Sequence, residues 1–200
     1  MTIMFHEGNR QLQDQFDSRR IADRLEEKLT RQAFTEGDRS LIEALPFFFL
    51  ATSDDRGRAD CSFKGGLPGF VRVTGASELA FPDYDGNGMF KSLGNILVNP
   101  EVGLLFIDMG EKPRRLRVNG RATVLRDDPL MQKFAGAQLL VRVAVRAIFP
   151  KCPRYVTTPG VAEPSKYAPR PGYEPPEPAW KGFDDFKDYV HPRQKTPDGD

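Results

Sequence analysis

Residues 114–125, with the sequence RRLRVNGRATVL, carry the pattern that most limits what this chain can fold into. Apolar residues at positions 116, 118, 122 and 124 alternate with polar residues that include Arg115, Arg117 and Asn119. Successive side chains of a strand point to opposite faces of its sheet, so the alternation predicts a strand. One face of this strand is expected to lie in a core, and the arginine face to meet solvent or a ligand.

Several other segments have the composition of short strands, and few helices separate them. Strands are predicted at residues 47–53, 59–64, 70–73, 78–81, 102–109 and 139–149. Helices are predicted at residues 9–34, 38–45, 88–99 and 127–136, the second opened by a capping box of Thr35 and Asp38. In the helix at 88–99, Met89, Leu93, Ile96 and Leu97 have helical spacing and are expected to pack inward. This arrangement favours an antiparallel barrel over a doubly wound sheet.

The composition excludes several classes of protein. Hydrophobic residues make up 39% of the 200 residues and the formal net charge is +1, so neither a membrane protein nor a nucleic-acid binder is expected. Two cysteines and two distant histidines, His6 and His191, make a zinc site improbable. The cysteine content and the absence of an apolar leader in the first residues predict a cytoplasmic protein.

The chain is expected to divide into three parts. These are an N-terminal helical extension at residues 1–37, a barrel domain at 38–156, and a proline-rich tail at 157–200. Ten of the 17 prolines lie in residues 153–200, which predicts an extended, irregular tail with one anchoring contact near Trp180.

Glycine and small polar residues crowd residues 61–99, between predicted strands. Glycines let a backbone approach a ligand closely. The sequence Lys64-Gly65-Gly66 can bring N–H groups and one ammonium group to an anion, and a helix that follows Asn87 and Gly88 can present its free N–H groups to a phosphate. The same residues also fit a plain strand connection and an asparagine-capped turn.

Other polar residues are candidates for the same ligand, although each also fits solvent exposure: Ser92, Asn95, Arg115, Arg117, Arg154 and Tyr155. A phosphate or a flavin carbonyl would suit the forked donors of the arginines. Cys61 lies within a predicted strand and is expected to be a packing residue rather than a nucleophile.

Taken in order, these segments resemble the pyridoxamine 5′-phosphate oxidase-like family, the FMN-binding split barrels. The resemblance covers roughly residues 40–150 and rests on FFFLATSDDRGRADCSFKGG, GFVRV, LAFPDYDGN, SLGNILVNPEVGLLFID and RRLRVNGRATVL. The last two are the most specific, because a helix ending in Asn-Pro, a buried strand and an arginine strand with a V-x-G step follow the family's usual order.

The resemblance implies a mainly β fold with flanking helices: a six-stranded antiparallel split barrel that forms a homodimer with FMN in clefts between the subunits. It also implies a set of cofactor-binding residues, with the last two expected from the partner subunit: Lys64, Gly65, Phe70, Val71, Arg72, Asp83, Tyr84, Asn87, Gly88, Ser92, Asn95, Arg115, Arg117, Arg154 and Tyr155. Family members often carry a basic pair where this chain has Gly88 and Met89. Lys64, Lys91 or an arginine is then expected to supply the missing charge.

The leading hypothesis is an FMN-dependent oxidoreductase that acts on a small-molecule redox substrate. The flavin itself carries the redox chemistry, so no catalytic acid or base is assigned. The arginine- and tryptophan-containing C-terminal segment of the true oxidases is not evident, so pyridoxamine phosphate is not the expected substrate. The alternative is a non-enzymatic protein that binds a flavin, a deazaflavin or haem.

Overall fold

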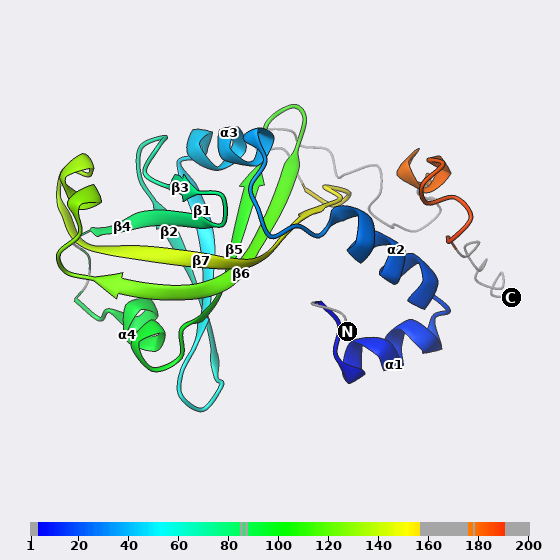
Figure 1. Ribbon diagram of the computed structural model, residues 1–200, viewed down its shortest axis with the longest axis horizontal. Helices are drawn as coiled ribbons and strands as arrows, with labels where there is room; N and C mark the ends of the chain where they lie inside the picture. Colours follow the sequence, from blue (N-terminus) through cyan, green and yellow to red (C-terminus); the bar gives the residue numbers. More distant parts are fainter. Residues whose placement is uncertain (1–3, 85, 87, 157–175, 178, 191–200) are drawn as a thin grey trace, which may run out of the picture. The chain divides into compact units, whose positions relative to one another are not determined.

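The computed structural model describes residues 4–84, 86, 88–156, 176–177 and 179–190, and the predicted site residue Asn87 lies outside them. The chain divides into two compact units (Figure 1). The described parts of residues 31–163 form one unit, and the described parts of residues 1–30 and 164–200 form the other. In the described residues, no helix is long and apolar enough to cross a membrane.

The larger unit is built around one antiparallel sheet. Its order is β2-β1-β5-β6-β7-β4-β3, and every neighbouring pair runs antiparallel. The strands are β1 (Phe47–Ser53), β2 (Ala59–Gly65), β3 (Arg72–Gly75), β4 (Glu78–Tyr84), β5 (Glu101–Asp108), β6 (Arg114–Leu125) and β7 (Ala137–Lys151). The predicted antiparallel β class is confirmed. The predicted number of six strands is wrong, because the short strand β3 pairs with β4 and makes seven.

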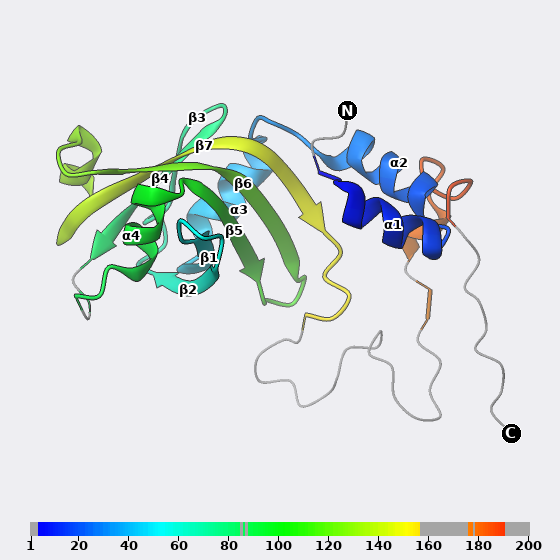
Figure 2. The same ribbon diagram turned by 90° about the horizontal axis from the view of Figure 1, so that it is seen from below.

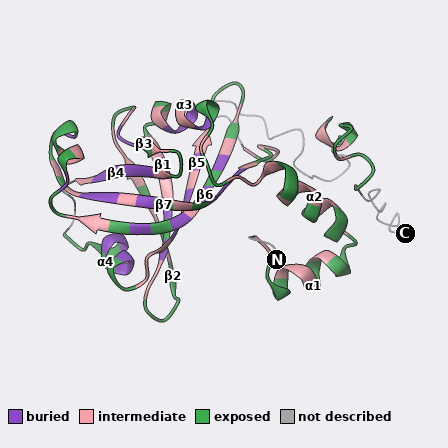
Figure 3. Cartoon of the chain, viewed as in Figure 1, coloured by how far each residue is buried: buried purple, intermediate pink, exposed green. Residues whose placement is uncertain are grey.

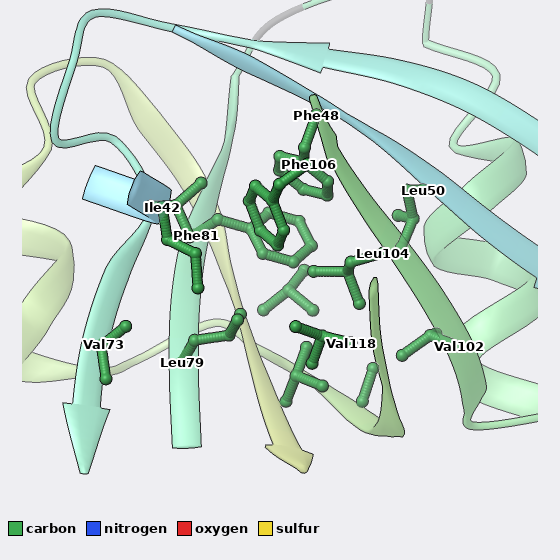
Figure 4. Packing of buried hydrophobic residues seen from close by; sticks show 14 of the residues in the cluster. Ile42, Phe48, Leu50, Val73, Leu79, Phe81, Val102, Leu104, Phe106 and Val118 are labelled. Atoms are coloured by element: carbon green, nitrogen blue, oxygen red, sulfur yellow. The ribbon is translucent and has the colours of Figure 1, made fainter. Parts of the chain in front are cut away.

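The sheet curls around the main hydrophobic core. Phe48 of β1 and Phe81 of β4 meet edge to face with ring centroids 4.9 Å apart, although β5, β6 and β7 lie between their strands in the sheet. Phe106 of β5 joins them, and its ring lies 5.3 Å from that of Phe48 (Figure 4). Only a strongly coiled sheet brings these rings together, and β6 and β7 are seen to arch across it (Figure 2). Strands β2 and β3 are left as its two edges.

Two helices, α3 (Glu36–Ala44) and α4 (Lys91–Val98), complete this core, and a 3-10 turn, η1 (Pro129–Lys133), precedes β7. The predicted capping box of α3 is confirmed, since the Thr35 hydroxyl accepts from the Asp38 N–H and the Asp38 carboxylate accepts from the Thr35 N–H. Helix α3 buries Leu41 and Ile42 in the core (Figure 3).

Helix α4 packs against β1 and β6, and the predicted inward packing is confirmed for Leu93 and Ile96, which are buried. It is wrong for Met89 and Leu97, which are 71% and 72% exposed. Met89 precedes the first turn of the helix. The buried face also includes Ser92 and Asn95, which find hydrogen-bond partners on the barrel strands.

The smaller unit contains α1 (Glu7–Gln15), α2 (Arg19–Leu29) and the 3-10 turn η2 (Ala179–Gly182). The prediction of one helix over residues 9–34 is wrong, because Asp17 takes a left-handed conformation, with φ of 46°, and separates α1 from α2. The C-terminal segment is held on α2 by Arg24, which donates to the Asp185 carbonyl and lies over the Tyr189 ring. Trp180 packs edge to face on Phe186.

Candidate functional site

A pocket of about 620 Å³ lies in the larger unit, between β2, the end of β4 and the start of α4. Strands β2 and β4 are not neighbours in the sheet, and they approach each other because the sheet curls. Its lining comprises Asp60, Cys61, Ser62, Phe63 and Lys64 of β2, Asp83 and Tyr84 of β4, Gly86, Gly88, Met89 and Phe90 of the following segment, Lys91, Ser92 and Leu93 of α4, and Gln138 of β7. Its size is that of an ordinary small-molecule site.

An irregularity in the sheet shapes one wall of this pocket. Asp83 pairs with Leu139, but Tyr84 pairs with Ala137, so the register skips Gln138. Adjacent residues of a regular strand face opposite sides of the sheet. Here Asp83, Tyr84 and Gln138 all line the pocket. Bulges that redirect side chains in this way are common beside active sites.

The floor of the pocket is tied together by neutral hydrogen bonds. The hydroxyl oxygens of Ser62 on β2 and Ser92 on α4 lie 2.8 Å apart. Behind them, Asn95 donates to the Thr52 hydroxyl of β1 at 2.9 Å. These bonds fix the start of α4 against the barrel.

The start of α4 faces the pocket with backbone donors. Its N-cap residue, Phe90, has φ of 47°, an uncommon conformation for a bulky side chain. Within the described residues, no side chain caps this helix start. The first N–H groups of a helix have no intrahelical partners and attract negative charge, so this end is suited to an anion.

The charges in the pocket are of both signs. Lys64 and Lys91 contribute ammonium groups, while Asp60 and Asp83 contribute carboxylates. Burial raises the pKa of Asp83 above its ordinary value, and the positive charge of Lys64 opposes that rise without cancelling it. Among the described residues, no group of three or more histidine, cysteine or acidic side chains is placed to hold a metal ion.

The family model for pyridoxamine 5′-phosphate oxidase matches residues 34–156, which is more than half of the chain. The chain belongs to this family. The match begins just before α3 and ends just after β7, so the family's split barrel accounts for the sheet and for every element that lines the pocket.

Three solved structures that are similar to part of this chain have low sequence identity to it. HupZ of Group A Streptococcus is 18% identical with a TM-score of 0.47, and the alignment covers 58% of this chain and 93% of HupZ. A putative pyridoxamine 5′-phosphate oxidase of Lactobacillus delbrueckii is 22% identical with a TM-score of 0.47, covering 60% and 95%. An FMN-binding protein of Syntrophomonas wolfei is 12% identical with a TM-score of 0.46, covering 73% and 96%. No curated protein matches the chain.

The family's split barrel brings part of the predicted site together in the pocket: Lys64, Asp83, Tyr84, Gly88 and Ser92. Gly65 ends β2 beside the Phe63 ring. Asn95 lies buried behind the pocket, bonded to Thr52.

The predicted residues around Phe70 lie elsewhere. The Phe70 and Val71 side chains are core residues, and both precede β3 rather than starting it. Arg72 is exposed and lies 3.9 Å from the Glu43 carboxylate. Any contact of this segment with a ligand is therefore expected through its backbone.

The predicted arginines form a second basic region, on the outer face of β6 and the end of β7. Arg115 donates to the Cys152 carbonyl, and its buried Nε has no partner among the residues that the structure describes. Burial lowers the pKa of Lys151, and the charges of Arg117 and Arg115 lower it further. Arg154 and Tyr155 follow β7 and stack on each other, 5.9 Å from guanidinium to ring. None of these residues lines the pocket of its own chain.

Several pocket residues were not predicted as site residues. Cys61, expected to pack, is exposed in the pocket, because β2 is an edge strand with no neighbour on one side. Phe63 and Asp60 lie on the same edge strand and share this explanation. Gln138 enters only through the skipped register with β4, which no sequence pattern reveals.

Proposed function

We propose that this protein is an FMN-dependent oxidoreductase that works as a homodimer. One subunit holds the flavin in the pocket between β2, β4 and α4, and the arginine face of a second subunit covers it. The observation that carries the proposal is a pocket that brings Lys64 of β2 and Lys91 of α4 together with a helix start that no described side chain caps, in a barrel of the pyridoxamine 5′-phosphate oxidase family.

The pocket's residues fit an FMN molecule. Two ammonium groups and the free N–H groups of α4 suit a phosphate, which is bound well by charge-assisted hydrogen bonds. The aromatic rings of Phe63, Tyr84 and Phe90 suit a planar ring system, and the serine hydroxyls suit a polyol chain. Lys91 and Lys64 supply the positive charge that Gly88 and Met89 do not.

When bound, FMN supplies hydride and electron transfer. The chain's own residues would orient it and set its electrostatic surroundings. Lys64 and Lys91 would bind the phosphate, and the α4 start would hold it through backbone N–H groups. The arginine face of the second subunit would add positive charge beside the ring, where it favours negative charge that develops on reduction.

An apolar face of the sheet supports the homodimer. Phe63, Phe49 and Leu105 lie opposite one another across β2, β1 and β5, and Arg117 of β6 continues the row. Phe63 is 62% exposed and stacks on Phe47, with centroids 5.3 Å apart. A row of partly buried apolar side chains that ends in an exposed phenylalanine suits an interaction site. Sedimentation velocity of the purified protein is expected to give a dimer, and a monomer at micromolar concentration would refute this part of the proposal.

The central experiment is an absorption spectrum of the purified protein, followed by titration with FMN. Flavin bands or saturable quenching of FMN fluorescence are expected. Lys64→Met should weaken FMN binding at least tenfold, because a charge-assisted hydrogen bond contributes about 1.5–3 kcal/mol. Lys112→Met removes the same charge from the exposed turn before β6, outside the pocket, and serves as the control.

The outcomes of this experiment separate the functions. A protein that stays colourless in excess FMN refutes the proposal, and a Soret band identifies a haem protein instead. Flavin that binds but is reduced by neither NADH, NADPH nor another donor favours a non-enzymatic flavoprotein. Pyridoxamine 5′-phosphate, added without oxygen, is expected to leave the bound flavin oxidised.

A further inference from the structure

Asp83 lies in the pocket without a fixed partner among the residues that the structure describes. It ends the regular part of β4, where the register skips Gln138, and its side chain lines the pocket. In the part of the chain that the structure describes, nothing donates a hydrogen bond to its carboxylate and no cation lies within ion-pair distance. Burial disfavours the ionised form of this half-buried carboxyl group and raises its pKa above the ordinary value.

Charged and titratable groups from three elements share the pocket with this carboxyl group: Asp60, Cys61 and Lys64 of β2, Tyr84 of β4, and Lys91 of α4. The neutral Gln138 lies on β7. Lys64 is the cation whose charge acts on Asp83 and keeps its pKa from rising further. Whatever engages Lys64 therefore changes the protonation of Asp83.

We propose that Asp83 is protonated when a ligand occupies the pocket, and that its O–H donates a hydrogen bond to an acceptor atom of that ligand. With FMN as the ligand, the acceptors available are ring carbonyl oxygens and ring nitrogens. The inference rests on the proposed function, since it takes FMN as the occupant. It assigns Asp83 the role of a specificity residue that selects an acceptor and disfavours a donor or a further negative charge.

The physical reason is electrostatic linkage. An anionic phosphate that pairs with Lys64 neutralises the charge that opposes protonation of Asp83, and it brings negative charge into the same pocket. Both effects raise the pKa of Asp83, so binding takes up a proton. If Asp83 instead accepted a hydrogen bond from a ligand N–H, its ionised form would be favoured and binding would release a proton.

The test is isothermal titration of FMN into the protein between pH 5 and pH 8, in buffers of different ionisation enthalpy. The phosphate of FMN, with a second pKa near 6, also exchanges protons on binding, and it does so equally in all variants. Wild type is expected to take up close to one proton more than Asp83→Asn at the pH of greatest difference. The ratio of their affinities then changes by up to about tenfold per pH unit, the limit for one linked proton.

Asp60→Asn is the matched control, because it removes the same charge from the same pocket and should keep the proton uptake of wild type. Infrared difference spectra of FMN-bound minus free protein give a second readout. A protonated carboxyl band is expected that disappears in Asp83→Asn. FMN that binds with no proton uptake assignable to Asp83, or with proton release, overturns the inference and leaves the proposed function intact. FMN that does not bind overturns both.

Discussion

Asp83 and Asp128 are two aspartates that lie beside the same strand, β7, in opposite electrostatic situations. Asp128 is buried and accepts hydrogen bonds from Arg142 Nε at 2.7 Å, Arg142 Nη2 at 3.0 Å and the Leu130 N–H at 2.8 Å. These bonds, led by those of Arg142, hold the pKa of Asp128 below its ordinary value. The pKa of Asp83 is instead raised by burial.

The difference separates a structural charge from a functional one. Arg142 of β7 bridges Asp128 and Glu78, so it joins the η1 turn to β4, and its own pKa is raised by these carboxylates. Every charge in this group, named here the Arg142 network, has a partner. In the pocket, Asp83 has no fixed partner among the described residues, and a group whose pKa is shifted without such a partner is a candidate to bind a ligand.

The largest effect is expected from removing the centre of the Arg142 network. Arg142→Leu leaves Asp128 buried without its cation and should lower the free energy of unfolding by about 3 kcal/mol, because an uncompensated buried charge is costly. Urea denaturation measures this. Arg121→Leu is the control, since Arg121 pairs with Glu101 on the surface and should change stability by less than about 1 kcal/mol. An equal loss of unfolding free energy in the two variants would contradict a structural role for the Arg142 network.

Removing the buried carboxylate itself should have a smaller effect. Asp128→Asn is expected to cost about 1.5–2 kcal/mol at pH 7, because it weakens hydrogen bonds to a charged group. A lowered folded-state pKa contributes stability above the unfolded value, near 3.8, and this is lost as the pH falls through the folded value. The stability difference between wild type and Asp128→Asn should therefore shrink below about pH 4. A stability difference between wild type and Asp128→Asn that stays constant across the pH range would show that the charge of Asp128 does not stabilise the fold.

Breaking the neutral hydrogen bond between Ser62 and Ser92 should lower the free energy of unfolding by less than either change to the Arg142 network. Ser62→Ala removes the hydrogen bond between β2 and α4 and is expected to cost about 1 kcal/mol. Ser92→Ala should cost the same, and the double variant little more than either alone, because both remove one interaction. Additive losses in this double-mutant cycle would show that the two hydroxyls do not act as a pair.

The sequence predicted the barrel better than it predicted the site. Strands and helix caps depend on residues close together in the chain, whereas the site depends on contacts between residues far apart in it. Strand β6 follows from local alternation, and the capping box of α3 from residues three apart. The break at Asp17 depends on one left-handed residue and left no signal in the apolar pattern. The buried face of α4 was predicted only in part, because Asn95 is buried through a bond to Thr52, which is 43 residues away.

The pocket residues that depend on long-range contacts were also not predicted from the sequence. Lys64, Asp83 and Tyr84 were predicted from the order of family segments, not from spacing alone. Gln138 was missed because it lines the pocket only where β7 and β4 change register. Likewise, the sequence alone does not distinguish Asp83 from Asp128. The structure shows that Asp128 pairs with Arg142, whereas Asp83 has no cation within ion-pair distance among the described residues.

Asp83→Asn should give the smallest change in stability of the variants considered, and it should be a gain rather than a loss. A folded-state pKa raised above 3.8 means that the folded protein holds the proton more tightly, so stability falls as the pH rises from 3.8 through the folded value. At pH 7 the ionised carboxylate is thus a small cost, below about 1 kcal/mol because solvent screens a half-buried group. The variant, which carries no charge, is expected to be slightly more stable than wild type at pH 7 and equal to it below about pH 4. Thermal unfolding at both pH values measures this, and a variant less stable at pH 7 would mean that Asp83, like Asp128, has a structural partner.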